Sequence, residues 1–222
     1  MALIEGSENN KSQEFILKTE SLIKFNINNR SKSQGHFFII SGPSGVGKNT
    51  LLNYALEKVK GIYYLPSITT RPPRAGETQG NPYYFTGIQQ FKKMIEDKLF
   101  LEWKMIHNGN YYGTHLPTIN YALKNGYNIA TDMDVLGFKD AKKRFSNNIV
   151  SIFVLPPSLE VLKNRLLIRD NNISLVNTRL ERVALEIKHK QHYDFVIIND
   201  SLERAGEELI LIMKEQLDSK DK

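Results

Sequence analysis

The glycine-rich stretch from Ser41 to Thr50 constrains the fold of this chain most strongly. It follows the apolar run His36–Ile40, whose length and content of aromatic and β-branched residues predict a buried strand. It precedes Thr50–Lys60, which we predict to be a helix. A strand that turns through glycines into a helix directs several backbone N–H groups and the positive end of the helix dipole into one concavity. The stretch therefore predicts a phosphate-binding loop.

The loop has the spacing of a nucleotide-binding loop and departs from it at one position. Gly42, Gly47 and Lys48 have the required spacing, and Lys48 is placed to reach the outer phosphates of a nucleoside triphosphate. The alternative, a glycine-rich turn with a surface lysine, is disfavoured by the predicted strand and helix. After the lysine, the pattern has Ser or Thr, whose hydroxyl binds Mg²⁺, whereas this chain has Asn49 and then Thr50. Because successive helix residues point about 100° apart, Thr50 does not replace a hydroxyl at position 49.

Composition limits the class of protein. With 222 residues and 41% apolar content, the chain is long enough for one domain with a sizeable core. It has no apolar stretch long enough to cross a membrane and no cysteine, so we expect a soluble, cytoplasmic protein without disulfides or thiolate metal sites. The net charge of +6 suits an anionic partner. We see no clustering of basic and aromatic residues, and we therefore expect neither nucleic acid nor membrane as a partner.

The remaining elements are predicted from apolar runs and from start and stop signals. The polar residues 1–34 predict a partly ordered extension, with a short amphipathic helix around Phe15–Phe25. Asp200 and Glu203 form a capping box that predicts the start of the last helix. Strands are predicted at Tyr63–Leu65, Tyr127–Thr131, Asn148–Leu155 and Asp194–Ile198, and helices at Gly87–Lys98, Pro117–Asn125, Leu159–Ile168 and from Asp200 to Leu217.

Two further motifs suggest anion and ligand chemistry. Arg71 and Arg74 flank two prolines, which stiffen the backbone and hold both guanidinium groups in a defined relation. Arginine suits bidentate phosphate binding, although taken alone this segment is more often a solvated basic loop. Asp132 and Asp134 follow a predicted strand at the edge where open α/β sheets bind ligands. A single Asp at such a place is often only a helix cap.

These motifs together resemble guanylate kinase, the nucleoside monophosphate kinase that transfers the γ-phosphate of ATP to GMP. The resemblance covers about Phe37 to Lys214 and rests on GPSGVGK, S-x-T-T-R-P-P-R-x-G-E, E-W, N-Y-Y-G-T, D-M-D and Y-D-F-V-I-I-N-D in the family's order. It implies an α/β P-loop kinase with a central parallel five-stranded sheet flanked by helices. It also implies a domain over residues 35–222, with its core at 35–66, 115–156 and 191–222, a GMP-binding subdomain at 67–114 and a helical lid at 157–190.

The resemblance also implies the roles of individual residues. The ATP-binding residues are expected to be Gly42, Pro43, Ser44, Gly45, Val46, Gly47, Lys48, Asn49, Thr50 and Asn199. The GMP-binding residues are expected to be Ser67, Arg71, Arg74, Tyr83, Glu102, Tyr112, Thr114 and Asp132. Catalysis is expected to involve Lys48, Arg71, Arg74 and the lid residues Arg165, Arg169 and Arg179, with Mg²⁺ near Asn49 and Asp134. Asn199 is also explained equally well as a turn residue after a strand.

The chemistry of the guanine site supports this assignment independently. A carboxylate at Glu102 can accept hydrogen bonds from guanine N1–H and from the exocyclic amine, whereas adenine has no N1 proton. Charge-assisted hydrogen bonds contribute about 1.5–3 kcal/mol each, and a buried carboxylate without a donor adds a desolvation cost. A large preference for guanine over adenine is therefore attainable.

The sequence departs from the family in three places. Asn49 follows the loop lysine, and we expect it to modify Mg²⁺ binding without abolishing it, because its amide oxygen is a permissible hard ligand. Leu136 stands where the family has Gln, and the lid segment from Arg169 to Ser174 is one residue shorter. Arg182, on the following helix, is expected at the surface.

Two other functions fit parts of the pattern. Guanylate-kinase-like domains also serve as protein-binding modules that hold a phosphorylated or acidic partner, but such modules lose parts of the phosphate loop and of the nucleotide-reading residues. This chain keeps Lys48, both phosphate arginines, Glu102 and Asp132. A P-loop kinase with another small phosphorylated acceptor is disfavoured by Glu102, Tyr112 and Thr114 together. We therefore expect ATP and GMP, with dGMP as a further acceptor left open, as the substrates of a monomer or homodimer.

Overall fold

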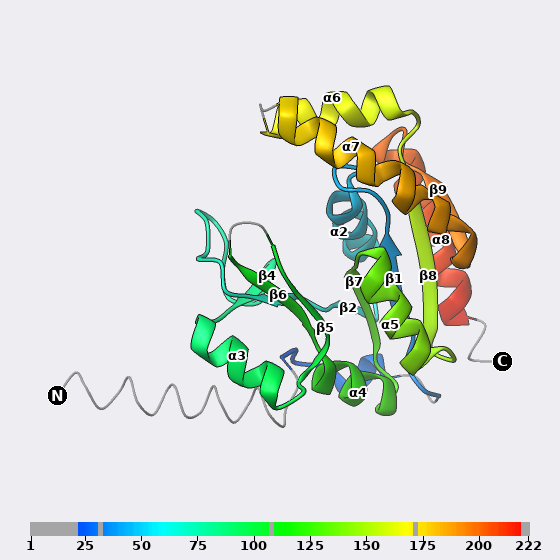
Figure 1. Ribbon diagram of the computed structural model, residues 1–222. Coiled ribbons are helices and arrows are strands. Elements are labelled where there is room, and N and C mark those ends of the chain that lie inside the picture. Colours follow the sequence, from blue (N-terminus) through cyan, green and yellow to red (C-terminus); the bar gives the residue numbers. More distant parts are fainter. Residues whose placement is uncertain (1–21, 31–32, 107–108, 171–172, 219–222) are drawn as a thin grey trace.

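The structure is a computed structural model that describes residues 22–30, 33–106, 109–170 and 173–218 (Figure 1). Its centre is a five-stranded sheet with the strand order β2-β7-β1-β8-β9, in which every paired strand is parallel. The strands are β1 (Phe37–Ser41), β2 (Ile62–Tyr64), β7 (Asn128–Asp132), β8 (Ile149–Leu155) and β9 (Phe195–Ile198). The predicted α/β class with a parallel five-stranded sheet is confirmed.

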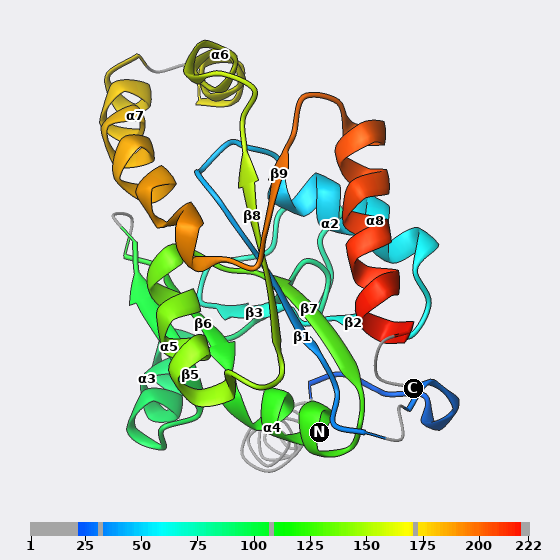
Figure 2. The ribbon, with the colours of Figure 1, turned by 90° about the vertical axis from the view of Figure 1, so that its right-hand side faces the viewer.

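Helices cover both faces of this sheet (Figure 2). Phe38 and Ile40 of β1 belong to a core cluster with residues of α2 and α8, whereas Phe37 and Ile39 belong to a second cluster with residues of α4 and α5. Such alternation is expected for a strand, because successive side chains point to opposite faces. The helices are α2 (Lys48–Lys58), α4 (Leu116–Lys124), α5 (Val135–Phe145), α6 (Leu159–Asp170), α7 (Ile173–Ile187) and α8 (Leu202–Asp218), with 3-10 turns at Ile27–Asn29 and Lys188–His192.

A second, smaller sheet stands beside the first, and its strand order is β4-β3-β6-β5 (Figure 1). Its members are β3 (Ser67–Thr69), β4 (Tyr83–Phe85), β5 (Phe100–Met105) and β6 (Tyr111–His115), with α3 (Ile88–Glu96) packed on it. The cluster between this sheet and the helix contains Ile68, Phe91, Met94 and Phe100. The rings of Phe91 and Phe100 stack with centroids 4.4 Å apart. The small sheet therefore has a core of its own.

The chain segment before β1 packs against the main domain where it is described. Phe25 stacks on Tyr127 with ring centroids 4.4 Å apart, and the Leu22 N–H donates to Thr118 Oγ1 over 2.9 Å. Residues 22–25 are not helical, and the rest of the helix expected around Phe15–Phe25 lies outside the described residues. No helix in the described part of the chain is long and apolar enough to cross a membrane.

Two helices, α2 and α8, begin two residues away from their predicted starts for local reasons. Helix α2 begins at Lys48 rather than Thr50, because Gly47 adopts a positive φ of 95° and serves as its N-cap. The capping box at Asp200 and Glu203 is wrong, because α8 begins at Leu202 and Ser201 is the cap. The Ser201 hydroxyl accepts from the Arg204 N–H over 3.2 Å, whereas Asp200 accepts from the Arg204 side chain. Ser158 caps α6, since its Oγ accepts from the Val161 N–H over 3.2 Å.

We predict that alanine substitutions at two nearby leucines of α8 lower the free energy of unfolding by different amounts. Leu209 is fully buried, whereas Leu211 is 57% exposed on the same helix. Leu209→Ala leaves a cavity and should lower the free energy of unfolding by about 2–5 kcal/mol. Leu211→Ala should change it by less than about 0.5 kcal/mol. Urea unfolding followed by circular dichroism measures both values, and equal losses in the two variants would contradict the packing described here.

Candidate active site

The glycine-rich loop connects the carboxyl end of β1 to the start of α2. Gly42, Gly45 and Gly47 have φ values of 144°, 84° and 95°, a region that favours glycine. Space is limiting as well, because a Cβ atom on Gly42 would lie 2.3 Å from the Val154 carbonyl oxygen of β8. The Lys48 ammonium group donates to the carbonyl oxygens of Gly42 and Pro43, over 2.7 and 3.1 Å. The loop thus curls around the lysine that the sequence analysis singled out.

One cleft of about 950 Å³ brings together residues predicted for two different nucleotides. Its walls come from the glycine-rich loop, the small sheet, the residues after β7 and the helices α6 and α7. The predicted site residues that line it are Gly42, Ser44, Gly45, Gly47, Lys48, Asn49, Thr50, Ser67, Tyr83, Glu102, Tyr112, Asp132, Asp134 and Arg165.

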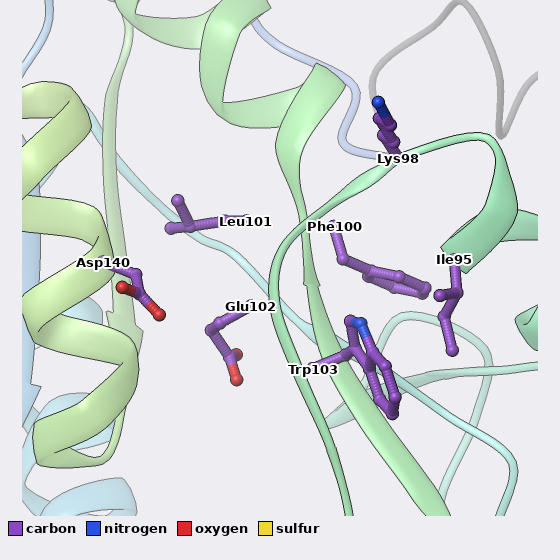
Figure 3. Close-up of a pocket in the computed structure, with 7 residues that line it drawn as sticks. All are labelled: Ile95, Lys98, Phe100, Leu101, Glu102, Trp103 and Asp140. Carbon is purple, nitrogen blue, oxygen red and sulfur yellow. The ribbon is translucent and has the colours of Figure 1, made fainter.

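Glu102 of β5 lines both this cleft and a smaller pocket of about 360 Å³, whose lining Figure 3 shows. Its Oε1 atom accepts from Thr114 Oγ1 over 2.6 Å, so two predicted GMP residues are directly bonded. Burial raises the pKa of Glu102, and the Thr114 hydrogen bond acts in the opposite direction. Asp140 of α5 points toward Glu102 in the figure and also raises this pKa. The carboxyl group is therefore held in a poorly solvated position, where it favours a ligand that donates hydrogen bonds.

Arg71 is held in place by Glu77, the last residue of the S-x-T-T-R-P-P-R-x-G-E motif, for which the sequence predicted no separate role. Its guanidinium group donates to both carboxylate oxygens of Glu77, over 2.7 and 2.9 Å, and only 9% of the residue is exposed. It also lies 5.2 Å from the centre of the Tyr83 ring. The Arg74 N–H donates to the same Glu77 carboxylate over 2.7 Å, while the Arg74 side chain is exposed. Glu77 therefore connects the two predicted phosphate arginines.

The arginines predicted in the lid differ in how closely they approach the loop. Arg165 of α6 lines the cleft and donates to the carbonyl oxygens of Val46 and Asn199, over 3.4 and 3.1 Å. Arg179 lies on α7 and is half-buried. Arg169 lies near the end of α6, but its side chain is outside the described residues, as are Asn171 and Asn172 of the shortened segment.

Asn199, which follows β9, contacts the glycine-rich loop directly. Its side-chain amide donates to the Val46 carbonyl oxygen over 2.8 Å, and the residue is buried. A Cβ atom on Gly47 would lie 2.7 Å from Asn199 Nδ2, so a side chain there would push the Asn199 amide away. Asn199, which the resemblance assigned to ATP binding, thus supports the loop directly.

Asp132 and Asp134, at the carboxyl end of β7, have different surroundings. Burial raises the pKa of Asp132, and the nearby Lys48 acts against this shift. Asp134 caps α5 by accepting from the Gly137 N–H over 2.9 Å, and it forms an ion pair with Lys104 of β5. Asp134 is therefore a helix cap, the role that the sequence left open as an alternative to ligand binding for a single Asp at this place.

Three charged residues line the cleft without having been predicted there. They are Lys104 of β5 and Arg182 and Glu186 of α7. Arg182 was expected at the surface, and it is indeed exposed, but it also faces the cleft. Helical spacing contained a weak signal for the α7 residues, because Arg179, Arg182 and Glu186 are three and four residues apart and share a helix face. Nothing in the sequence pointed to Lys104.

Comparison with known proteins identifies the family. The family model for guanylate kinase matches residues 34–216. The chain is 38% identical to the guanylate kinase of Haemophilus influenzae over 85% of this chain and 92% of that protein, and 41% identical to that of Campylobacter jejuni over 82% and 88%. A crystal structure of guanylate kinase from Anaplasma phagocytophilum aligns with a TM-score of 0.65 and 29% identity, over 83% of this chain and 87% of that one.

The chain belongs to the guanylate kinase family. The resemblance noted in the sequence is thereby confirmed. The geometry shows what the departures from the family's pattern do in this guanylate kinase. Asn49 and Thr50 are both exposed and both line the cleft, so the side chain that departs from the pattern is open to a bound ligand. Leu136 is 70% exposed on the first turn of α5 and does not line the cleft.

We predict that the Arg71–Glu77 pair makes the stability of this guanylate kinase depend on pH in the acidic range. Hydrogen bonds from Arg71 lower the pKa of Glu77 to about 2, below the ordinary value near 4.3. A carboxyl whose pKa is lower in the folded state stabilises the fold above its unfolded pKa and loses that contribution as pH falls through its folded pKa.

The test compares the midpoint of thermal unfolding of the natural chain with that of Glu77→Gln from pH 8 to pH 3. The difference between the two midpoints should be constant from pH 8 to 5 and should shrink below about pH 4.5. The natural chain binds a proton at Glu77 when it unfolds in this acidic range, whereas the Glu77→Gln variant does not. Glu57→Gln, at an exposed position on α2, is the reference for removing one surface carboxylate. A difference between Glu77→Gln and the natural chain that stays constant down to pH 3 would contradict the pairing.

Proposed function

We propose that the chain transfers the γ-phosphoryl group of ATP to GMP and releases ADP and GDP. Membership of the guanylate kinase family supports this activity. The observation that carries the proposal is the single cleft, in which a phosphate-binding loop with Lys48 faces a carboxylate, Glu102, bonded to Thr114. One wall suits the phosphates of a nucleoside triphosphate, and the other suits a base that donates hydrogen bonds.

On the ATP side, the loop N–H groups of Gly42 to Thr50 bind the phosphates. Lys48 moves from the carbonyl oxygens of Gly42 and Pro43 to the outer phosphates. Burial lowers the pKa of Lys48, but the carboxylates of Asp132 and Glu186 act against this shift and favour the charged form. Asn199 supports the loop near the adenine end of the site.

Mg²⁺ fits the residues present, although few of them can bind it directly. Among the described residues, no three His, Cys, Asp or Glu side chains are grouped to hold a metal. The amide oxygen of Asn49 and the carboxylate of Asp134 are hard oxygen donors on the cleft wall, which is the chemistry Mg²⁺ prefers. Held there, the ion would neutralise the negative charge that develops during phosphoryl transfer.

On the GMP side, Glu102, Thr114, Ser67 and Asp132 read the guanine. Arg71, Arg74, Tyr83 and Tyr112 bind the phosphate and orient its oxygen for in-line attack on the γ-phosphorus. Arg71 is preorganised for this role by Glu77, so little side-chain entropy is lost on binding. Phosphoryl transfer needs positioning and charge neutralisation more than covalent chemistry, and no side-chain nucleophile is required.

The helical segment at residues 157–190 serves as a lid. Arg165, Arg169 and Arg179 neutralise the equatorial oxygens of the transferring group as the lid excludes water. We assign the GMP-binding subdomain to residues 67–114, the catalytic core to residues 35–66, 115–156 and 191–222, and residues 1–34 to an extension. We further propose that the enzyme works in the cytoplasm as a monomer or homodimer.

We predict ADP release with ATP, Mg²⁺ and GMP, and none with AMP, CMP or UMP in place of GMP. Lys48→Ala should lower kcat/KM by about 100-fold or more, because it removes a charge that stabilises the transferring phosphoryl group. Lys60→Ala is the matched control, since Lys60 is exposed just after α2 and outside the cleft. A coupled assay for ADP measures all these rates. GMP binding without ADP release in the natural chain would contradict phosphoryl transfer.

We also predict that the charge of Glu102 sets the choice of base. Glu102→Gln keeps the size and one acceptor but removes the charge, and it should lower kcat/KM for GMP by about tenfold to hundredfold. The rate with AMP should stay low, so the ratio of kcat/KM for GMP to kcat/KM for AMP should fall. Glu96→Gln, at an exposed position on α3 outside the cleft, is the matched control. An unchanged kcat/KM for GMP in Glu102→Gln would remove Glu102 from guanine recognition.

A further inference from the structure

Lys104 lines the cleft and has no role in the mechanism proposed above. It lies on β5, where it is the register partner of Tyr112 in the antiparallel pairing with β6. Residues directly opposite each other in such a pair project from the same face of the sheet. Lys104, Tyr112 and Glu102 all line the same cleft. Lys104 therefore belongs to the wall that faces GMP rather than to the loop that faces ATP.

The partner of Lys104 comes from the other sheet. Its ammonium group forms an ion pair with Asp134, the residue that caps α5 after β7. The two side chains are 49% and 38% exposed, so water reaches the pair and a ligand oxygen can compete for the ammonium group. Half-exposed ion pairs contribute little to stability, and the pair is therefore readily exchanged.

The charges around Lys104 make it important to an anionic ligand. The cleft contains four carboxylates, Glu102, Asp132, Asp134 and Glu186, and each of them would repel a phosphate when ionised. Lys104 interacts electrostatically with all four. The Lys48 ammonium, the other lysine of the cleft, is bound to loop carbonyl oxygens on the ATP side. Lys104 is thus placed to compensate the acidic groups where the acceptor must enter.

We propose that Lys104 is a further GMP-binding residue, whose ammonium group passes from Asp134 to the phosphate of GMP. The proposal rests on the acceptor role of GMP described above. A phosphate monoester carries more charge than the Asp134 carboxylate and offers more acceptor oxygens, so it competes effectively for the ammonium group. Asp134 keeps its cap on α5 after the exchange, because the Gly137 N–H binds its other oxygen, Oδ1.

Binding of GMP and of guanosine, measured by titration calorimetry without ATP or Mg²⁺, tests the proposal. Lys104→Met and Lys104→Gln should each raise the dissociation constant for GMP about tenfold, because they remove one charge-assisted hydrogen bond. The constant for guanosine, which has no phosphate, should stay within about twofold. Lys143→Met is the matched control, because Lys143 pairs with Asp140 within α5 and lies outside the cleft. It should change neither constant.

Asp134→Asn separates phosphate binding from a purely structural latch between the sheets. Asn is as good an N-cap as Asp, so α5 keeps its start while Lys104 loses its charged partner. The dissociation constant for GMP should then fall or stay the same. Weaker binding of both GMP and guanosine in the Lys104 variants and in Asp134→Asn would overturn the proposal in favour of a latch. Unchanged GMP binding in the Lys104 variants would overturn this proposal alone, whereas failure of the natural chain to bind GMP would overturn the proposed function.

Discussion

The burial of β1 is the constraint on which the rest of the site depends. Residues Phe37 to Ser41 are fully buried, with β7 and β8 hydrogen-bonded on either side and helices on both faces. A strand enclosed in this way fixes the position where its chain emerges. The loop must turn at once, and Gly42 leaves no room for a side chain against β8. Leu51 and Leu52 then anchor α2 in the same core, so both ends of the loop are held.

Neighbouring strand ends complete the site because parallel strands finish at one edge. Asp132 ends β7 on one side of β1, and Asn199 follows β9 on the other side. Asn199 binds the loop at Val46, and Arg165 binds both, so the loop is supported from α6 as well. The second sheet contributes another wall of the cleft, with Glu102 and Tyr112 on the lining and Thr114 bonded to Glu102. A cleft between two separately packed sheets can bind two nucleotides facing each other.

Local patterns in the sequence predicted the glycine-rich loop and the strands of the main sheet to within two residues, whereas the parallel arrangement of that sheet was implied by the family resemblance and the strands β3 to β6 were not predicted. The start of α8 was missed because Asp200 and Ser201 are both good caps, and only the hydrogen bond to Arg204 decides between them. The bond between Arg71 and Glu77 spans six residues across a turn and follows no helical or strand period. The pairing of Lys104 with Asp134 depends on how two sheets approach each other, which no local pattern encodes.

The charge balance of the cleft follows from this arrangement. Four carboxylates and four basic side chains line the cleft. A polyanionic ligand must therefore be bound by individual cations at defined positions, rather than by a general positive potential. Three of these cations are already engaged in the folded chain: Lys48 with loop carbonyl oxygens, Arg165 with Val46 and Asn199, and Lys104 with Asp134. Binding therefore exchanges partners instead of ordering free side chains. Such exchange lowers the entropic cost of binding, and it makes affinity sensitive to the carboxylate or carbonyl that each cation leaves behind.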